Sequence, residues 1–113
     1  VAFGSDWSVS SVNPMPQIET ALTRVDAESH ATEVMNPEQR ITIEQAVAAF
    51  TLGTAYVNHQ DDVTGSIEVG KLADLVVLDQ NIFEIDPERI SETKVLLTLF
   101  EGKPVYGSPG RSL

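Results

Sequence analysis

Asp6 is the residue with the clearest chemical potential in this sequence. It follows a short apolar stretch, residues 1–3, and the breaker pair Gly4 and Ser5, so we expect it at the end of a strand. A carboxylate at the C-terminal end of a barrel strand can bind a metal ion or act as a general base. The competing interpretation is local, because an aspartate in this setting commonly forms a turn or caps a helix. The local sequence by itself favours the turn or cap.

Histidine spacing adds nothing to this candidate site. The 2 histidines, His30 and His59, form neither a His-x-His nor a His-Glu-x-x-His pattern. His30 and Glu33 would share a helix face if that stretch were helical, but such a pair makes a weak metal site. Both histidines are therefore interpreted as surface residues.

Trp7, directly after Asp6, has two interpretations that the sequence leaves open: a core anchor or a wall of a substrate pocket. The serines around it lack the Gly-x-Ser-x-Gly pattern of a nucleophile and are interpreted as loop residues: Ser5, Ser8, Ser10 and Ser11. Gly65 and Gly70 match no phosphate-binding motif and are interpreted as punctuation between strands, with Lys71 as a solvated turn residue.

Composition excludes several classes of partner. With 7 basic and 17 acidic residues the formal net charge is −10, so nucleic acid and membrane surfaces are poor candidates. No apolar run approaches the roughly 20 residues of a membrane helix, and no leader is visible. There are 0 cysteines, which excludes disulfides and thiolate ligands. We expect a soluble globular segment of a cytoplasmic protein, although an exported parent would be equally compatible with this composition.

Apolar spacing predicts the helices that follow Asp6. After a loop, a short amphipathic helix is expected over about residues 16–25, with Ile18 and Leu22 facing inward and Glu19 facing outward. A surface connection with a turn of helix follows over residues 26–40.

A second helix is predicted with more detail. Thr42 is its expected N-cap and Gln45 the capping-box partner, and the apolar positions continue to about Asn58. Small residues such as Gly53 would let this helix lie close to a neighbour.

The period then changes from helical to strand-like. Residues 65–71 are expected to alternate with Ile67 and Val69 inward, and residues 72–79 to form a strand buried on both faces. Asp86 is the expected cap of a short helical turn, with Pro87 at its first position. The Glu101-Gly102 pair predicts a tight hairpin near the end of a set of about four strands, before a frayed tail.

The stretch GSIEVGKLADLVVLDQN, residues 65–81, taken with Gly4-Ser5-Asp6, resembles a known family. It looks like the C-terminal part of a metal-dependent hydrolase of the amidohydrolase superfamily, in the YtcJ-like branch with exoenzyme-regulatory members. The resemblance covers nearly the whole chain. It implies an α/β fragment: the last strand and helices of a TIM-like (β/α)8 barrel over residues 1–60, an accessory β-sandwich segment over residues 61–107, and a disordered tail over residues 108–113.

The same resemblance implies a function for the parent. Such enzymes hydrolyse carbon–nitrogen bonds of the amide type in small molecules with a divalent metal, commonly zinc. Asp6 would be the metal-site carboxylate and proton acceptor, and Trp7 would line the substrate pocket. The histidines and the bridging ligand of such sites lie on earlier strands outside this chain. Because a catalytic zinc takes about three protein ligands, we expect this chain of 113 residues to be inactive alone.

Two further expectations remain open at this stage. The chain could instead be a non-catalytic structural or regulatory module of an amidohydrolase-like protein, with Asp6 as a cap. In addition, a first strand without its barrel partners would expose an apolar edge, which favours homo-oligomers.

Overall fold

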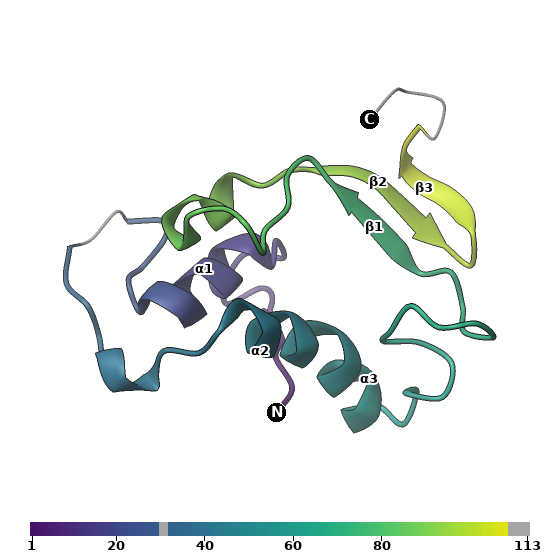
Figure 1. Ribbon diagram of the computed structural model, residues 1–113, viewed down its shortest axis with the longest axis horizontal. Helices are drawn as coiled ribbons and strands as arrows, with labels where there is room; N and C mark the ends of the chain where they lie inside the picture. Colours follow the sequence, from purple (N-terminus) through teal and green to yellow (C-terminus); the bar gives the residue numbers. More distant parts are fainter. Residues whose placement is uncertain (30–31, 109–113) are drawn as a thin grey trace.

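The computed structural model describes residues 1–29 and 32–108, and Figure 1 shows its helices and sheet. His30 and nearly all of the predicted disordered tail lie outside the described residues. The helical elements are α1 (Met15–Thr23), the 3-10 turn η1 (Pro37–Gln39), α2 (Ile43–Ala48), the π-helical turn η2 (Ala49–Gly53), α3 (Thr54–Val57) and the 3-10 helix η3 (Pro87–Glu92). The strands are β1 (Leu75–Leu78), β2 (Val95–Phe100) and β3 (Lys103–Gly107).

The helix predicted after the Asp6 loop is confirmed as α1, shifted by a residue or two. It begins at Met15 after the N-cap Pro14, and Asn13 Oδ1 accepts the backbone N–H of Met15 at 3.1 Å. Arg24 ends it in the left-handed conformation, with φ of 58°. The outward placement of Glu19 is wrong, since this residue is only 8% exposed. Its carboxylate finds a partner on η3, far away in sequence.

The second predicted helix is confirmed from its cap to its end. Thr42 Oγ1 accepts the N–H of Gln45 at 3.2 Å, and Gln45 Oε1 accepts the N–H of Thr42 at 2.9 Å. This reciprocal pair satisfies two N–H groups that a helix start would otherwise leave unpaired. α2, η2 and α3 then follow one another without a break as far as Val57. No capping or spacing pattern in the sequence predicted the π-helical turn in the middle.

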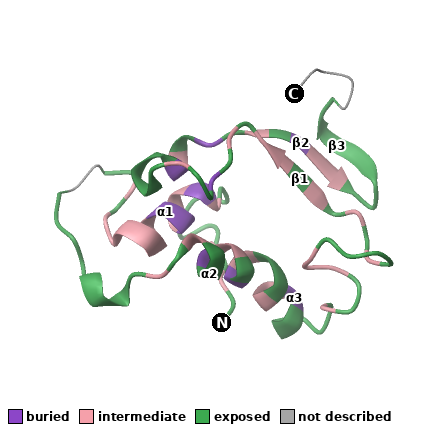
Figure 2. Cartoon of the chain, in the orientation of Figure 1, coloured by how far each residue is buried: buried purple, intermediate pink, exposed green. Residues whose placement is uncertain are grey.

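The hydrophobic core lies between the helices. Its buried members are Met15 and Ile18 of α1, Ala46 of α2 and Ile90 of η3. Figure 2 shows these buried positions gathered on the helical side of the molecule. Ile90 is brought there by the predicted helical turn, which is confirmed: Asp86 Oδ1 accepts the N–H of Glu88 at 3.0 Å at its start. The core therefore joins residues of the two predicted segments, 1–60 and 61–107, whose division into separate units stays a prediction.

The sheet is a three-stranded antiparallel sheet of order β1-β2-β3 (Figure 1). The predicted hairpin is confirmed: Glu101 and Gly102 connect β2 and β3 with φ of 50° and 79°. Positive φ at both turn residues is the geometry of a type I′ turn, whose twist matches that of the strands it joins. Asp74 supports the turn, since its Oδ1 accepts the N–H of Glu101 at 2.8 Å.

The expected strand over residues 65–71 is wrong. Ile67 is 87% exposed and Val69 108% exposed, and both lie in an irregular segment rather than on a sheet. Gly65 and Gly70 each have φ of 93°, a conformation that L side chains rarely adopt. Alternating side chains form a half-buried strand only when a neighbouring strand is present, and in the described residues this segment pairs with none.

The expectation that residues 72–79 are buried on both faces is also wrong. Only residues 75–78 form β1, and Val76 is 55% exposed. A strand buried on both faces needs a packed layer on each side of its sheet, and the exposure of Val76 shows that its side chain lacks such close cover in the described residues. The accessory β-sandwich that the resemblance implies, which would supply that layer, stays a prediction.

Residues 1–3 do not form a strand in this structure. They run along the helix of α2, η2 and α3 (Figure 1), and the N–H of Phe3 donates to the carbonyl oxygen of Ala49 at 3.0 Å. The predicted self-association had assumed a free strand edge here; it stays a prediction that sedimentation at several concentrations would test. Within the described residues no helix is long and apolar enough to cross a membrane.

Candidate metal-site carboxylate

Asp6 lies at the start of a tight turn. Its φ of 52° is left-handed, a conformation in which aspartate and asparagine are enriched among non-glycine residues. The carbonyl oxygen of Asp6 accepts the N–H of Val9 at 2.8 Å, and the hydroxyl of Ser10 donates to the carbonyl of Ser5. The backbone of this loop is thus closed on itself, while the Asp6 side chain remains exposed.

The segment before Asp6 is held by the continuous helix of α2, η2 and α3 (the long helix). Both backbone groups of Phe3 are engaged there: its N–H binds Ala49 O at 3.0 Å, and its carbonyl accepts the hydroxyl of Thr54 at 2.9 Å. The Phe3 and Phe50 rings meet edge to face, with centroids 5.5 Å apart and an angle of 76° between planes. This is a favourable aromatic geometry, so Phe3 is fixed by its backbone and by its side chain.

The segment after Asp6 is held by α1. Gln17 Nε2 donates to the carbonyl oxygen of Ser11 at 2.8 Å, and Ser11 Oγ accepts the N–H of Asn13 at 3.1 Å. The loop that carries Asp6 is therefore anchored on one side to the long helix and on the other to the start of α1. This arrangement presents the carboxylate on a supported turn.

The interpretation of Asp6 as a helix cap is wrong. Asn13, not Asp6, serves the first turn of α1. In the part of the chain that the structure describes, the Asp6 carboxylate accepts no hydrogen bond, and only its backbone takes part in the turn. The side chain is therefore available to a ligand, and its role at a metal stays a prediction.

A complete metal centre is not formed by the described residues. Within residues 1–29 and 32–108 there is no group of three or more histidine, cysteine, aspartate or glutamate side chains placed to hold an ion. His59 is exposed, as expected, in the turn after α3. Asp6 fits a metal as a single, freely accessible carboxylate, and the remaining ligands would have to come from elsewhere.

Trp7 is 71% exposed. Of the two interpretations of this residue, the core anchor is therefore wrong. A role in lining a substrate pocket stays a prediction.

One polar cluster was missed around Lys71, which is not the solvated turn residue expected. Its ammonium group lies 2.7 Å from Ser66 Oγ and 3.0 Å from Glu68 Oε2, and its side chain is only 13% exposed. Ser66 Oγ also donates to the Glu68 carboxylate. The hydrogen bond from Ser66, then the hydrogen bond and charge of Lys71, hold the pKa of Glu68 below its usual range. The signal available in the sequence was the presence of Ser66, Glu68 and Lys71 within six residues.

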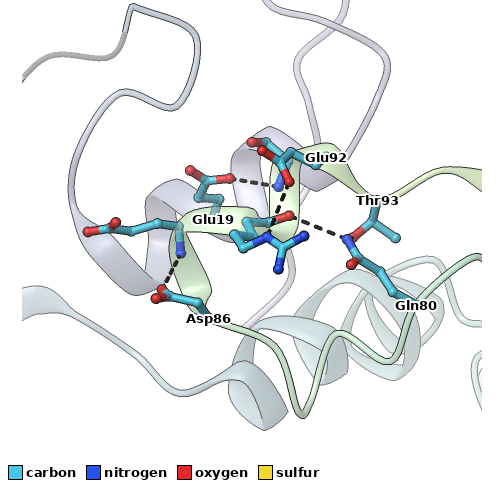
Figure 3. Close-up of polar contacts among 8 residues, drawn as sticks. Glu19, Gln80, Asp86, Glu92 and Thr93 are labelled. Atoms are coloured by element: carbon cyan, nitrogen blue, oxygen red, sulfur yellow. Dashed lines mark hydrogen bonds and ion pairs between the residues drawn. The ribbon is translucent and has the colours of Figure 1, made fainter.

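A second polar cluster connects α1 to η3, and Figure 3 shows it. The carboxylate of Glu19 accepts the backbone N–H of Ser91 at 2.6 Å. Beside it, Gln80 Nε2 donates to Thr93 Oγ1 at 2.8 Å, where Thr93 is itself buried. No local pattern marks Glu19, because its partner is 72 residues away along the chain. These contacts link α1 to η3, and Gln80 to Thr93 at the end of η3, so we interpret them as structural.

Comparison with known proteins defines the class. The model of the amidohydrolase family matches residues 1–106, so the chain belongs to that family. Over 107 residues it is 36% identical to Protein LONG AFTER FAR-RED 3 of Arabidopsis thaliana, covering 94% of this chain and 18% of that protein. It is 29% identical to the N-substituted formamide deformylase of Arthrobacter pascens, covering 97% of this chain and 20% of that enzyme. With YtcJ, described as an amidohydrolase of Bacillus subtilis, it shares 28% identity over 93% of this chain and 20% of that protein.

A solved structure agrees with this assignment. The crystal structure of an amidohydrolase from Thermotoga maritima matches with a TM-score of 0.52 and 27% identity, covering 63% of this chain and 17% of that chain. The recognised resemblance to amidohydrolases, including the YtcJ-like branch, is therefore confirmed. The chain spans about a fifth of the length of the curated relatives it matches, at 18% to 20% of each.

Proposed function

We propose that this chain is the C-terminal part of a metal-dependent hydrolase that cleaves carbon–nitrogen bonds of the amide type in small molecules. The observation that carries the proposal is the family match over residues 1–106, which includes Asp6, whose carboxylate is exposed and has no hydrogen-bond partner in the described part of the chain. One relative is named an N-substituted formamide deformylase, and a formamide is an amide. In this proposal residues 1–3 form the last barrel strand of the parent. The sheet β1-β2-β3 is the part of the parent's accessory β-sandwich that this chain contributes.

Asp6 has two roles in the proposal, metal-site carboxylate and proton acceptor. A bound divalent ion, zinc in the first instance, would supply a water whose pKa is lowered towards about 7. A carboxylate oxygen of Asp6 would be the group that accepts a proton from water during hydrolysis of the substrate. In this proposal Trp7, which follows directly on the same loop, lines the substrate pocket. Since Asp6 alone cannot hold a catalytic ion, residues 1–113 are inactive without the other ligands.

The test is turnover by the longer protein of which we propose this chain is a part. Asp6→Asn keeps the size of the side chain and removes its charge and basicity. Loss of a general base typically lowers the rate about 10²- to 10⁴-fold. Asp62→Asn, at an exposed aspartate after α3, makes the same chemical change away from the loop. The proposal expects hydrolysis of N-substituted formamides or related amides by the parent and by Asp62→Asn, and a large loss in Asp6→Asn. Equal rates in all three would contradict the role of Asp6.

A further inference from the structure

We propose that Gln17 is a positioning residue for the loop that carries Trp7, acting through the carbonyl group of Ser11. The inference rests on the proposed function, because there the loop after Asp6 lines the substrate pocket. It concerns only this loop and the helix that follows it. The inference therefore applies both when residues 1–3 lie on the long helix and when they form a barrel strand.

One side chain attaches the loop to the first turn of α1. Gln17 Nε2 donates to the carbonyl oxygen of Ser11 at 2.8 Å, and the two residues are 6 positions apart in the chain. At the other end of the loop, the N–H of Val9 donates to the carbonyl oxygen of Asp6 at 2.8 Å. Trp7 thus lies between two fixed points, the turn that begins at Asp6 and the carbonyl group that Gln17 holds. Neither bond depends on a distant part of the chain.

The other amide atom of Gln17 indicates that this contact has a task. Gln17 Oε1 is buried and, among the described residues, has no hydrogen-bond partner. A buried acceptor without a partner costs free energy, and a methionine at this position would avoid that cost. Packing alone therefore does not favour a glutamine here. What glutamine adds is the Nε2 donor that Ser11 receives.

An ordinary packing role for the half-buried Gln17 is the competing explanation. The two explanations differ in what Gln17→Met does, since methionine has a similar length and no donor. The Ser11 carbonyl is exposed, so water can replace the lost donor and the free energy of unfolding should change little. A packing role predicts loop exchange that follows this global free energy. The positioning role predicts a loop that opens more often while the global free energy of unfolding is nearly constant.

The first measurement is amide hydrogen exchange at Val9 in the 113-residue chain. In Gln17→Met we expect exchange at Val9 to accelerate about threefold to tenfold, the range for one lost hydrogen bond. Gln17→Glu places an oxygen against the Ser11 carbonyl oxygen and should act in the same direction, so either variant suffices if the other does not fold. Gln39→Met, at an exposed glutamine of η1, is the matched control. Fluorescence anisotropy of Trp7, the chain's 1 tryptophan, should fall only in the Gln17 variants. Wild-type exchange at Val9 in both Gln17 variants would overturn the inference.

The second measurement is KM against kcat in the longer protein. Loss of a contact that substrate and transition state share raises KM and leaves kcat unchanged. For N-substituted formamides we expect KM to rise about threefold to tenfold in Gln17→Met, and at least as much in Trp7→Ala. The double variant should match Trp7→Ala, because both changes act on one contact.

The outcomes separate the inference from the proposed function. Wild-type KM in Gln17→Met, or fully additive effects in the double variant, together with lost turnover in Asp6→Asn, would overturn the positioning role and leave the proposed function intact. Full turnover in Asp6→Asn would instead overturn the proposed function, whatever the exchange data at Val9.

Discussion

The hydroxyl of Thr54 donates a hydrogen bond of 2.9 Å to the carbonyl oxygen of Phe3, 51 residues earlier in the chain. This contact ties the segment that leads into Asp6 to the middle of the long helix. Most of the hydrophobic core lies elsewhere, between α1, α2 and η3, so the placement of the candidate carboxylate and the stability of the chain rest on largely different residues.

Gly53→Ala should detach the N-terminal segment and leave the helix intact. The new Cβ would meet the carbonyl oxygen of Val1 at 2.1 Å, whereas alanine favours the helix itself by up to about 1 kcal/mol. We therefore expect faster amide exchange at Phe3 with little loss of global stability. Gly4→Ala is the control, because its Cβ would meet nothing within 4 Å. Unchanged exchange at Phe3 in Gly53→Ala would show that the close approach is not needed.

Ile90→Ala should be strongly destabilising. Ile90 is 0% exposed and packs between α1 and α2, and truncation of such a residue typically costs about 2–5 kcal/mol. Ile67→Ala makes the same change at a residue that is 87% exposed, so we expect an effect within about 0.5 kcal/mol. Denaturant unfolding of both variants measures this. Comparable losses at the two positions would mean that residues 65–71 are packed after all.

Glu19→Ala should lower the free energy of unfolding, because it removes the hydrogen bond that links α1 to η3. Removal of the carboxylate leaves the N–H of Ser91 without its charged acceptor, a loss of about 1.5–3 kcal/mol. Glu19→Gln keeps a neutral acceptor and should lose less. Glu84→Ala, at an exposed glutamate before η3, should be nearly neutral in the same unfolding experiment. An unchanged free energy of unfolding in Glu19→Ala would contradict a stabilising role for the hydrogen bond between Glu19 and Ser91.

The Ser66–Lys71–Glu68 cluster predicts a pH dependence. Its contacts lower the pKa of Glu68 in the folded chain, so their contribution is present above the pKa of the unfolded residue and is lost as pH falls through the lower, folded pKa. The loss thus begins below about pH 4.3. Carboxyl NMR titration should show the Glu68 pKa rising towards its usual value in Ser66→Ala and staying low in Ser8→Ala. A Glu68 pKa that does not respond to Ser66→Ala would contradict the leading role of that hydrogen bond.

Features whose partners are close in sequence were predictable. The capping box of Thr42 and Gln45, the turn capped by Asp86 and the Glu101-Gly102 hairpin each satisfy their own backbone groups within a few residues. Nothing distant is needed to define them, and all three are confirmed.

Features that depend on distant partners were not predictable. Glu19 is buried where the N–H of Ser91 meets it, and Ile67 is exposed because no strand among residues 1–29 and 32–108 pairs with its segment. For the candidate site the sequence singled out the Asp6 loop, but the bond from Thr54 to Phe3 that supports it required the structure. The widened turn η2 has no local sequence signal that would have indicated it.

The most direct test of the central claim is the metal content of the longer protein by elemental mass spectrometry, measured beside Asp6→Asn and the control Asp62→Asn. We predict near-stoichiometric zinc or a similar divalent ion in the parent and in Asp62→Asn, with reduced metal and lost hydrolysis in Asp6→Asn. A parent that holds no metal even after supplementation would contradict the claim, and the chain would then be a structural or regulatory module that kept the fold without the chemistry.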